Sequence, residues 1–214
     1  MLVAPSLLAA DFLHLESEVG KLNSGADWIH LDVMDGTFVP NISFGFSVLE
    51  ALAPVAKKPM DVHLMVVHPE RWFKRLSELG VSSVSFHLEA AGRRTSANIR
   101  EIQGLGMKAG VVINPDVPVQ KLYPYIGKAD FFLIMSVFAG FGGQKFIYES
   151  IDRVAALRAE IEKRGASALI EVDGGVSTGN AAALREAGAD VVVAGSSVFK
   201  SQDPVAAMQA LREA

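Results

Sequence analysis

The chain has 214 residues, of which 50% are hydrophobic and 21% are charged, and its formal net charge is -4. This mixture is typical of a folded globular chain, and an acidic balance without a basic stripe argues against a nucleic-acid partner. The chain contains no Cys, which excludes disulfides and thiolate ligands, so any metal has to be held by His and carboxylate side chains.

No apolar run approaches the roughly 20 residues that a membrane span requires. The first residues, MLVAPSLLAADF, also lack the basic start of a secretion signal. The absence of Cys is compatible with the cytosol. We therefore expect a soluble, untargeted, cytoplasmic protein with no membrane partner.

Short apolar runs rich in β-branched residues recur along the chain and predict eight strands. In chain order the predicted strands are 3–8, 28–34, 59–66, 83–89, 108–114, 131–137, 168–174 and 191–199. Between them lie segments whose apolar residues recur at a spacing of three and four, which predicts helices. The clearest predicted helices are 12–22, 69–79, 149–164 and 178–188.

Several predicted strands follow a Gly that is suited to ending a helix, as in Gly25-Ala26-Asp27 and Gly188-Ala189-Asp190. Eight strand and helix units with short connections favour an α/β fold, a (β/α)8 TIM barrel with parallel strands that forms a single domain over 1–214. An open doubly wound sheet is the alternative. It usually needs only five or six strands, and no GxGxxG follows the first strand here.

Polar residues late in a predicted strand are candidates for the active site, because a barrel builds its site at the carboxyl ends of its strands. His30 and Asp32 share one face of the second strand, His63 lies on the third, and Asp173 lies on the seventh. Taken singly, each is better explained as a hydrogen-bonded core residue. Together they predict a site for one divalent cation, with Zn²⁺ favoured and Fe(II), Mn²⁺ and Co²⁺ as alternatives.

Other titratable residues on the same strands receive different interpretations. Asp61 and Glu171 lie deeper along the third and seventh strands, so we expect them to support the ligands through hydrogen bonds. His87, on the fourth strand, is expected to be structural or solvent-facing. The same expectation holds for His14 and His68.

Three segments near the last predicted strands are rich in glycine: 139–144 after the sixth strand, 173–177 after the seventh, and 194–197 in the eighth. An ordinary turn explains any one of them, but barrels bind phosphate on backbone N–H groups in the loops after strands seven and eight. The phosphate candidates are therefore Gly174, Gly175, Gly195 and Ser196.

The loop after the sixth strand and three methionines complete the predicted pocket. Gly140, Gly142 and Gly143 are expected to make that loop flexible enough to close over a substrate. Met34, Met65 and Met135 lie near strand ends; methionine is common in ordinary cores, and beside a metal we interpret these three as the apolar wall of the pocket. Residue types and spacing name no reaction.

Several motifs together resemble one known family, the ribulose-phosphate 3-epimerases. The matching segments, in order along nearly the whole chain, are APSLLAADF, HLDVMDGTFVPN, DVHLMV, GFGGQKF, EVDGGV and AGSSVF. The resemblance implies that His30, Asp32, His63 and Asp173 hold a divalent metal and that Asp32 and Asp173 are the acid and base. It also implies substrate contacts at Ser6, at His63 and in the glycine segments, which include Phe141.

The implied reaction is the metal-dependent epimerisation of D-ribulose 5-phosphate at C3 to D-xylulose 5-phosphate, through an enediolate, in the pentose phosphate pathway. Two bases are needed, because a proton α to the ketone leaves from one face and returns on the other. No nucleotide cofactor is required. Barrels of this size are often oligomers, so we expect a homo-oligomer, although no interface is legible in the sequence.

The sequence departs from the family pattern at two pairs of residues. Phe138-Ala139 replaces an acidic or amide residue followed by Pro, and Phe46-Ser47 stands where Pro is common, so a looser lid is expected. A six-carbon ketose phosphate such as allulose 6-phosphate therefore remains an alternative substrate. The same residue types also suit a metal-dependent hydrolase or a non-catalytic phosphosugar-binding barrel, and the paired Asp32 and Asp173 argue against both.

Overall fold

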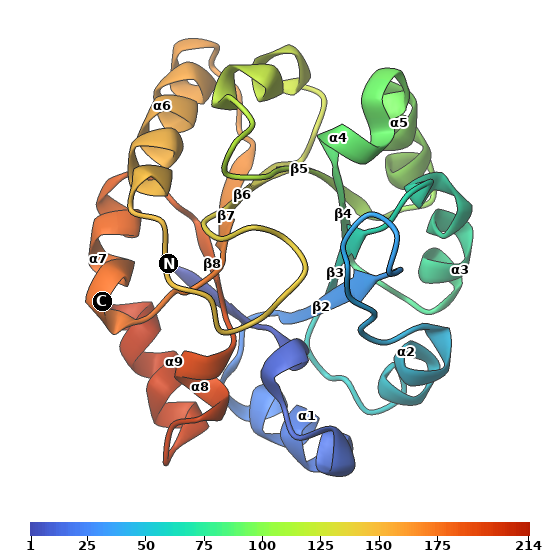
Figure 1. Ribbon diagram of the computed structural model, residues 1–214, viewed down its shortest axis with the longest axis vertical. Coiled ribbons are helices and arrows are strands. Elements are labelled where there is room, and N and C mark those ends of the chain that lie inside the picture. Colours follow the sequence, from blue (N-terminus) through green and yellow to red (C-terminus); the bar gives the residue numbers. More distant parts are fainter.

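The computed structural model describes residues 1–214, and parallel strands form its centre with helices around them (Figure 1). The strands are β1 (Leu2–Pro5), β2 (Ile29–Met34), β3 (Met60–Met65), β4 (Ser83–His87), β5 (Lys108–Ile113), β6 (Phe131–Met135), β7 (Leu169–Asp173) and β8 (Val191–Ala194). The helices are α1 (Leu15–Gly25), α2 (Phe46–Leu52), α3 (Phe73–Glu78), α4 (Leu88–Ala91), α5 (Thr95–Gly104), α6 (Glu149–Lys163), α7 (Thr178–Glu186), α8 (Ser196–Phe199) and α9 (Pro204–Glu213).

The sheet has the strand order β1-β8-β7-β6-β5-β4-β3-β2, and every pairing is parallel. Between β1 and β2 the ring is completed by a parallel bridge of Ser6 with His30 and by hydrogen bonds from the backbone N–H groups of Asp27 and Trp28 to the Val3 carbonyl oxygen. The predicted (β/α)8 TIM barrel is confirmed. None of its helices combines the length and the apolar character that crossing a bilayer demands.

Side chains alternate between the two faces of each strand, and this creates two layers. On β2, Leu31 joins an apolar cluster of 47 buried residues, which also includes Val154, Leu157 and Ile161 of α6. Those three follow the helical spacing of three and four, so α6 packs one apolar face onto the strands. The other face of β2 carries His30 and Asp32, which are buried inside the barrel.

The ends of the first and last predicted strands were wrong. Strand β1 stops at Pro5, and the chain turns into a 3₁₀ helix (Leu7–Ala9) because the Ser6 side chain accepts a hydrogen bond from the Leu8 N–H group at 3.3 Å. Strand β8 stops at Ala194, and after Gly195 the residues predicted as strand form α8. Both turns lie at the carboxyl ends of their strands, where they face the site.

Candidate active site

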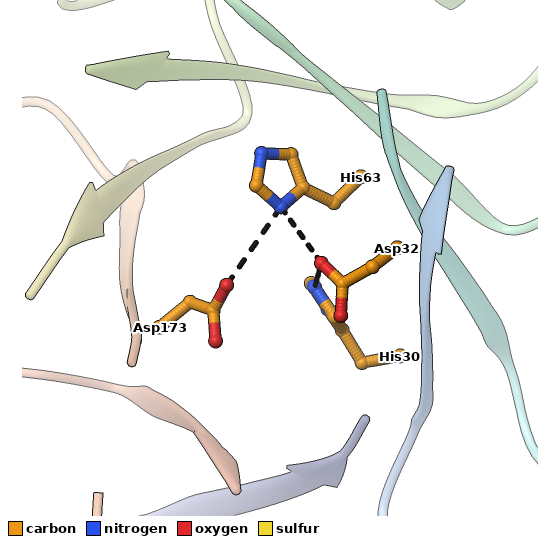
Figure 2. Close-up of side chains that lie close together, drawn as sticks. All are labelled: His30, Asp32, His63 and Asp173. Carbon is orange, nitrogen blue, oxygen red and sulfur yellow. Dashed lines mark hydrogen bonds and ion pairs between the residues drawn. The ribbon is translucent and has the colours of Figure 1, made fainter. Parts of the chain in front are cut away.

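Four titratable side chains from three strands converge inside the barrel mouth (Figure 2). One ligand atom from each of His30, Asp32, His63 and Asp173 lies within 4.8 Å of those of the others. The register explains this, because Asp32 of β2 lies directly beside His63 of β3, and His30 is two residues before Asp32 on the same face. The structure thus brings together all four residues that the sequence predicted as a cation site.

The short distances within this cluster join imidazole nitrogen atoms to carboxylate oxygen atoms. His63 Nδ1 lies 3.1 Å from Asp32 Oδ1 and 3.8 Å from Asp173 Oδ2. His30 Nε2 lies 3.4 Å from Asp32 Oδ1. Both imidazoles are fully buried and Asp32 is nearly so, so water does not satisfy these groups from behind.

The unpaired Nε2 of His30 indicates that the donor set suits a cation. His30 Nδ1 lies 2.6 Å from Asp61 Oδ2, so the ring proton sits on Nδ1 and is donated to that carboxylate. Nε2 is buried and has no hydrogen-bond partner. Burial lowers the pKa of His30, but the negative charge of Asp32 and the hydrogen bond to Asp61 outweigh it and raise that pKa well above its ordinary value, so the pocket favours a positive charge beside Nε2. A divalent cation supplies that charge when Nε2 carries no proton, and two imidazoles with two carboxylates are suitable ligands for it.

Asp61 supports the cluster through a hydrogen bond, as expected, whereas neither carboxyl oxygen of Glu171 has a hydrogen-bond partner, so the expectation of such support from Glu171 was wrong. Asp61 accepts hydrogen bonds from His30 Nδ1 and, at 2.6 Å, from the Ser83 hydroxyl. Glu171 Oε1 lies 3.5 Å from His30 Nδ1. Burial and the negative charge of Asp61 raise the pKa of Glu171 to about 8, so Glu171 carries a proton at neutral pH.

The two aspartates of the cluster have opposite pKa shifts. Burial by itself raises the pKa of Asp32, but the adjacent His30 and His63 outweigh it and hold that pKa well below its ordinary value. Burial, followed by the negative charge of Asp32, raises the pKa of Asp173 to about 7. Burial also lowers the pKa of His63 to about 4, so that ring is neutral. At neutral pH the cluster therefore offers one ionised carboxyl group and one that is protonated in about half of the molecules.

A cleft opens from this cluster toward solvent. Its walls include both aspartates and most of the predicted pocket residues: Ser6, Met34, Met65, Met135, Phe141, Gly142, Gly143, Gly174, Gly175, Gly195 and Ser196. The Ser6 hydroxyl donates a hydrogen bond to Asp32 Oδ2. Gly140 lies outside the lining, and its carbonyl oxygen accepts a hydrogen bond from Asn41 Nδ2 at 2.8 Å. Gly140 therefore ties the loop after β6 to the loop after β2.

The segment that joins β6 to α6 crosses over the mouth of the barrel (Figure 1). Within it, Gln144 Nε2 donates hydrogen bonds to the carbonyl oxygens of Phe138 at 2.6 Å and Phe141 at 2.8 Å. Gln144 and Phe138 also line the cleft, and neither was predicted as a pocket residue. Gln144 lies in the glycine segment 139–144 and Phe138 in the pair Phe138-Ala139, so the sequence pointed to this loop but not to its internal hydrogen bonds.

The remaining histidines differ in burial, and so do the two residue pairs that depart from the family pattern. His14 and His68 are exposed, whereas His87 is fully buried beside His63, so a solvent-facing role for His87 is excluded. Phe138 is half exposed at the cleft. Phe46, in contrast, starts α2 and packs against Trp72 with a centroid distance of 5.5 Å.

Comparison with known proteins identifies the family. Residues 2–199 match the ribulose-phosphate 3 epimerase family. The chain belongs to this family. It is 44% identical over 211 residues to the ribulose-phosphate 3-epimerase of Mycobacterium bovis, which covers 99% of this chain and 91% of that protein. It is 42% identical over 212 residues to the ribulose-phosphate 3-epimerase of Bacillus subtilis, which covers 98% of this chain and 97% of that protein.

A solved structure of 3-hexulose-6-phosphate synthase from Salmonella typhimurium has a similar fold. It matches with a TM-score of 0.74 and 17% identity, over 100% of this chain and 97% of that chain. Likeness at this identity supports the barrel fold alone. Membership of the ribulose-phosphate 3-epimerase family makes the protein an isomerase, and the family implies a sugar phosphate as substrate.

Proposed function

We propose that the protein interconverts D-ribulose 5-phosphate and D-xylulose 5-phosphate by epimerisation at C3, with one divalent cation bound, in the cytoplasmic pentose phosphate pathway. The observation that carries the proposal is the pair of carboxyl groups with opposite pKa shifts, Asp32 and Asp173, in a cluster with two imidazoles. The family and the names of the curated relatives support the choice of substrate.

Epimerisation needs one group that removes a proton α to the ketone and another that returns a proton to the opposite face. Asp32 is ionised at neutral pH and is suited to accept the proton. Asp173 holds a proton up to a pKa of about 7 and is suited to donate it. In the reverse reaction the two residues exchange roles, because each then starts in the other protonation state.

His30, Asp32, His63 and Asp173 are the residues that would hold the cation. When bound, the cation supplies Lewis-acid stabilisation of the negative charge that develops on the substrate oxygens. Zn²⁺ is the favoured ion for this mixed set of nitrogen and oxygen donors, with Fe(II), Mn²⁺ and Co²⁺ as alternatives. Asp61 keeps the His30 proton on Nδ1, so Nε2 stays available as a ligand.

The rest of the cleft is assigned to binding. We assign the substrate phosphate to backbone N–H groups near Gly174, Gly175, Gly195 and Ser196, which share the cleft wall. The methionines Met34, Met65 and Met135 form its apolar side. Residues 140–143 cover the substrate, and Ser6 contacts it beside Asp32.

The deciding experiment is NMR of the purified protein with ribulose 5-phosphate in D₂O, with and without a chelator. We expect deuterium to enter at C3 and xylulose 5-phosphate to appear. Both changes should be lost when the chelator is present. Exchange on allulose 6-phosphate but not on ribulose 5-phosphate would move the substrate to a six-carbon sugar. Release of inorganic phosphate without exchange would replace the epimerase by a hydrolase.

A further inference from the structure

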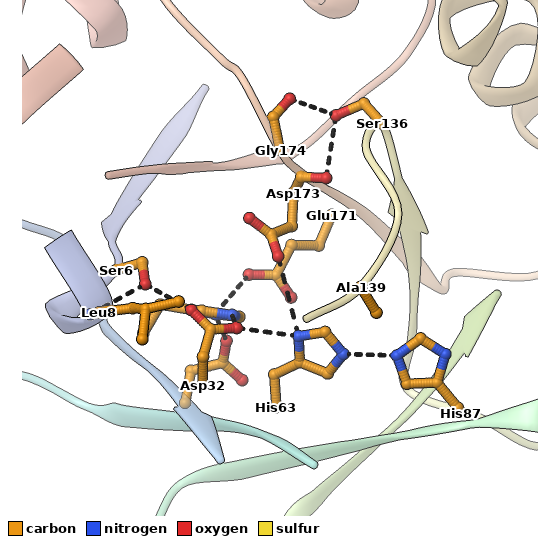
Figure 3. A network of polar contacts seen from close by, with 12 residues as sticks. Ser6, Leu8, Asp32, His63, His87, Ser136, Ala139, Glu171, Asp173 and Gly174 are labelled. Carbon is orange, nitrogen blue, oxygen red and sulfur yellow. Dashed lines mark hydrogen bonds and ion pairs between the residues drawn. The ribbon is translucent and has the colours of Figure 1, made fainter. Parts of the chain in front are cut away.

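His87 of β4 makes a contact with His63 that the proposed reaction does not use (Figure 3). The two Nε2 atoms are 2.9 Å apart, and the rings are stacked with centroids at 5.0 Å and an interplanar angle of 25°. The Phe38 ring lies 4.7 Å from the His87 ring, and His87 is fully buried. Water therefore does not compete for the nitrogen atoms of this pair.

The far side of His87 faces a fixed carboxylate. His87 Nδ1 has no hydrogen-bond partner, and Glu89 Oε1 lies 3.6 Å from it. Glu89 Oε1 accepts hydrogen bonds from both the backbone N–H and the Nδ2 of Asn114, each at 3.0 Å. Burial raises the pKa of Glu89, but His87 and the Asn114 N–H group outweigh it and lower that pKa, so Glu89 is ionised.

Asn114 is itself held from two directions, which fixes the position of Glu89. Arg153 Nη2 donates to the Asn114 carbonyl oxygen at 2.8 Å. Asn114 Oδ1 accepts a hydrogen bond at 3.0 Å from the backbone N–H of Ala139, at the start of the loop over the cleft. A continuous series of polar contacts thus runs from the cation cluster through His63, His87, Glu89 and Asn114 to that loop.

Only one proton fits between the two Nε2 atoms. When both rings are neutral, the hydrogen bond between His63 and His87 therefore has two possible directions. In the first, His63 Nδ1–H donates to Asp32 and His87 Nε2–H donates to His63. This direction leaves His87 Nδ1 as a bare acceptor beside Glu89, and it agrees with the short 3.1 Å contact to Asp32 and the unpaired His87 Nδ1.

The second direction reverses both hydrogen bonds. His63 Nε2–H donates to His87 Nε2, and His87 Nδ1–H points at Glu89. His63 Nδ1 is then a bare lone pair facing Asp32, which is unfavourable without a cation and is what a cation requires of its ligand. The two rings carry two N–H protons in either direction, so no proton is gained or lost.

We propose that His87 and Glu89 are positioning residues that set the tautomer of the ligand His63, and that cation binding reverses the His63–His87 hydrogen bond. The proposal rests on the cation site of the proposed function. Its specific consequence is that the cation affinity depends on an acceptor at the position of His87 Nε2 and on the negative charge of Glu89.

Cation affinity of His87 variants tests the acceptor. His87→Phe keeps a buried ring but leaves the His63 Nε2–H without a hydrogen-bond partner. We expect this variant to bind Zn²⁺ about 10- to 100-fold more weakly, which is the typical loss of metal affinity when a residue that hydrogen-bonds to a ligand is removed. His87→Gln offers a carbonyl oxygen near the lost Nε2, and we expect an affinity within about threefold of the unaltered protein, given that the donor of His63 is then satisfied. Competition with a chromophoric chelator measures both.

A role of His87 in packing alone predicts the opposite order, because Phe fills the ring space better than Gln. Equal affinities of the two variants, or a loss confined to His87→Gln, would overturn the proposal. His14→Phe, at an exposed histidine, is the matched control. The absorption spectrum of the Co²⁺-loaded proteins adds a readout of ligand geometry that does not depend on turnover.

The tautomers are measured directly in the unaltered protein by ¹⁵N NMR of its histidine rings. Without metal we expect a proton on His63 Nδ1 and on His87 Nε2; with Zn²⁺ we expect protons on His63 Nε2 and on His87 Nδ1. A doubly protonated His87, or the same tautomers in both states, contradicts the proposal. This measurement remains decisive if the His87 variants fail to fold.

Glu89→Gln keeps an acceptor for Asn114 but removes the charge that favours the second direction. We expect the Zn²⁺ affinity to fall about three- to tenfold, and an unchanged affinity counts against the role of Glu89. Failure of the cation site looks different from failure of this proposal. If the unaltered protein binds no Zn²⁺ or Co²⁺, the proposed function loses its cation, whereas normal binding with unchanged tautomers removes only the role of His87.

Discussion

The two faces of the barrel strands hold different kinds of side chain and serve different purposes. The outer face packs on the helices through one apolar cluster of 47 buried residues. The inner face has only small apolar clusters, such as that of Val112, Leu133 and Met135, set among buried His, Asp and Glu residues. Burying charged groups costs stability, so the inner face gives up stability that the outer face supplies.

The sharpest way to test this division is to change an inner carboxylate without changing its size. We expect Asp32→Asn and Asp173→Asn each to lower kcat/KM by about 10³-fold, within the range for loss of a general acid or base. Progress curves for ribulose 5-phosphate measure the effect. Asp152→Asn, an exposed aspartate on α6, is the control and should leave activity unchanged. Activity near normal in either site variant would remove that residue from proton transfer.

A substitution on the outer face should lower stability and leave the catalytic rate unchanged. Phe132 of β6 is fully buried against the helices, so we expect Phe132→Ala to lower the free energy of unfolding by about 3–5 kcal/mol while the folded enzyme keeps its kcat. Urea titration measures the stability. Leu13→Ala, at a side chain that is 89% exposed, should change it by less than about 0.5 kcal/mol. A large fall in kcat of folded Phe132→Ala would show that the two layers are not separable.

The inner carboxyl groups also predict a pH dependence of stability in the metal-free protein. Asp173 keeps its proton up to a pKa of about 7 when folded, whereas the unfolded chain releases it near the ordinary pKa of 3.8. The folded state therefore binds more protons between these values, and the contribution of Asp173 to stability falls as pH rises, by up to about 1.4 kcal/mol per pH unit. Glu171, with a pKa of about 8, acts in the same direction.

His63 acts in the opposite direction, because its pKa is lowered to about 4 and its contribution to stability rises with pH up to 6.5. The difference between the unaltered protein and Asp173→Asn isolates the aspartate. We expect the stability of the unaltered protein relative to this variant to fall as pH rises from about 5 to about 6.5. Urea titrations at several pH values provide the measurement, and a constant difference would mean that Asp173 has no raised pKa.

The smallest expected effect comes from the rim of the cleft. Gly175 has φ +64, and a Cβ there would lie 2.7 Å from the Phe146 backbone N. We expect Gly175→Ala to cost about 1–2 kcal/mol of stability and to raise KM for the sugar phosphate. Gly165 has φ +61 in open space, so Gly165→Ala should share the backbone strain without the change in KM. Equal KM values for the two variants would place the phosphate elsewhere.

The repeating pattern of the sequence was sufficient to predict the barrel, because apolar runs and helical spacing reflect local burial. It was also sufficient to predict which polar residues share a strand face, since alternation depends only on the number of residues between them. The ends of β1 and β8 escaped prediction because Ser6 and Gly195 redirect the backbone within an otherwise apolar run. Gln144 escaped because its bonds to Phe138 and Phe141 exist only once the loop is folded.

The sequence by itself determined the eightfold alternation, the inward placement of His30, Asp32, His63 and Asp173, and the family. Only the tertiary structure decided which carboxyl group keeps its proton, because the pKa depends on burial and on charges that come from other strands. It also decided that His87 contacts His63. Which residues of β3 and β4 lie side by side depends on the register between these strands, and the distance between the His63 and His87 side chains depends on how the whole barrel packs.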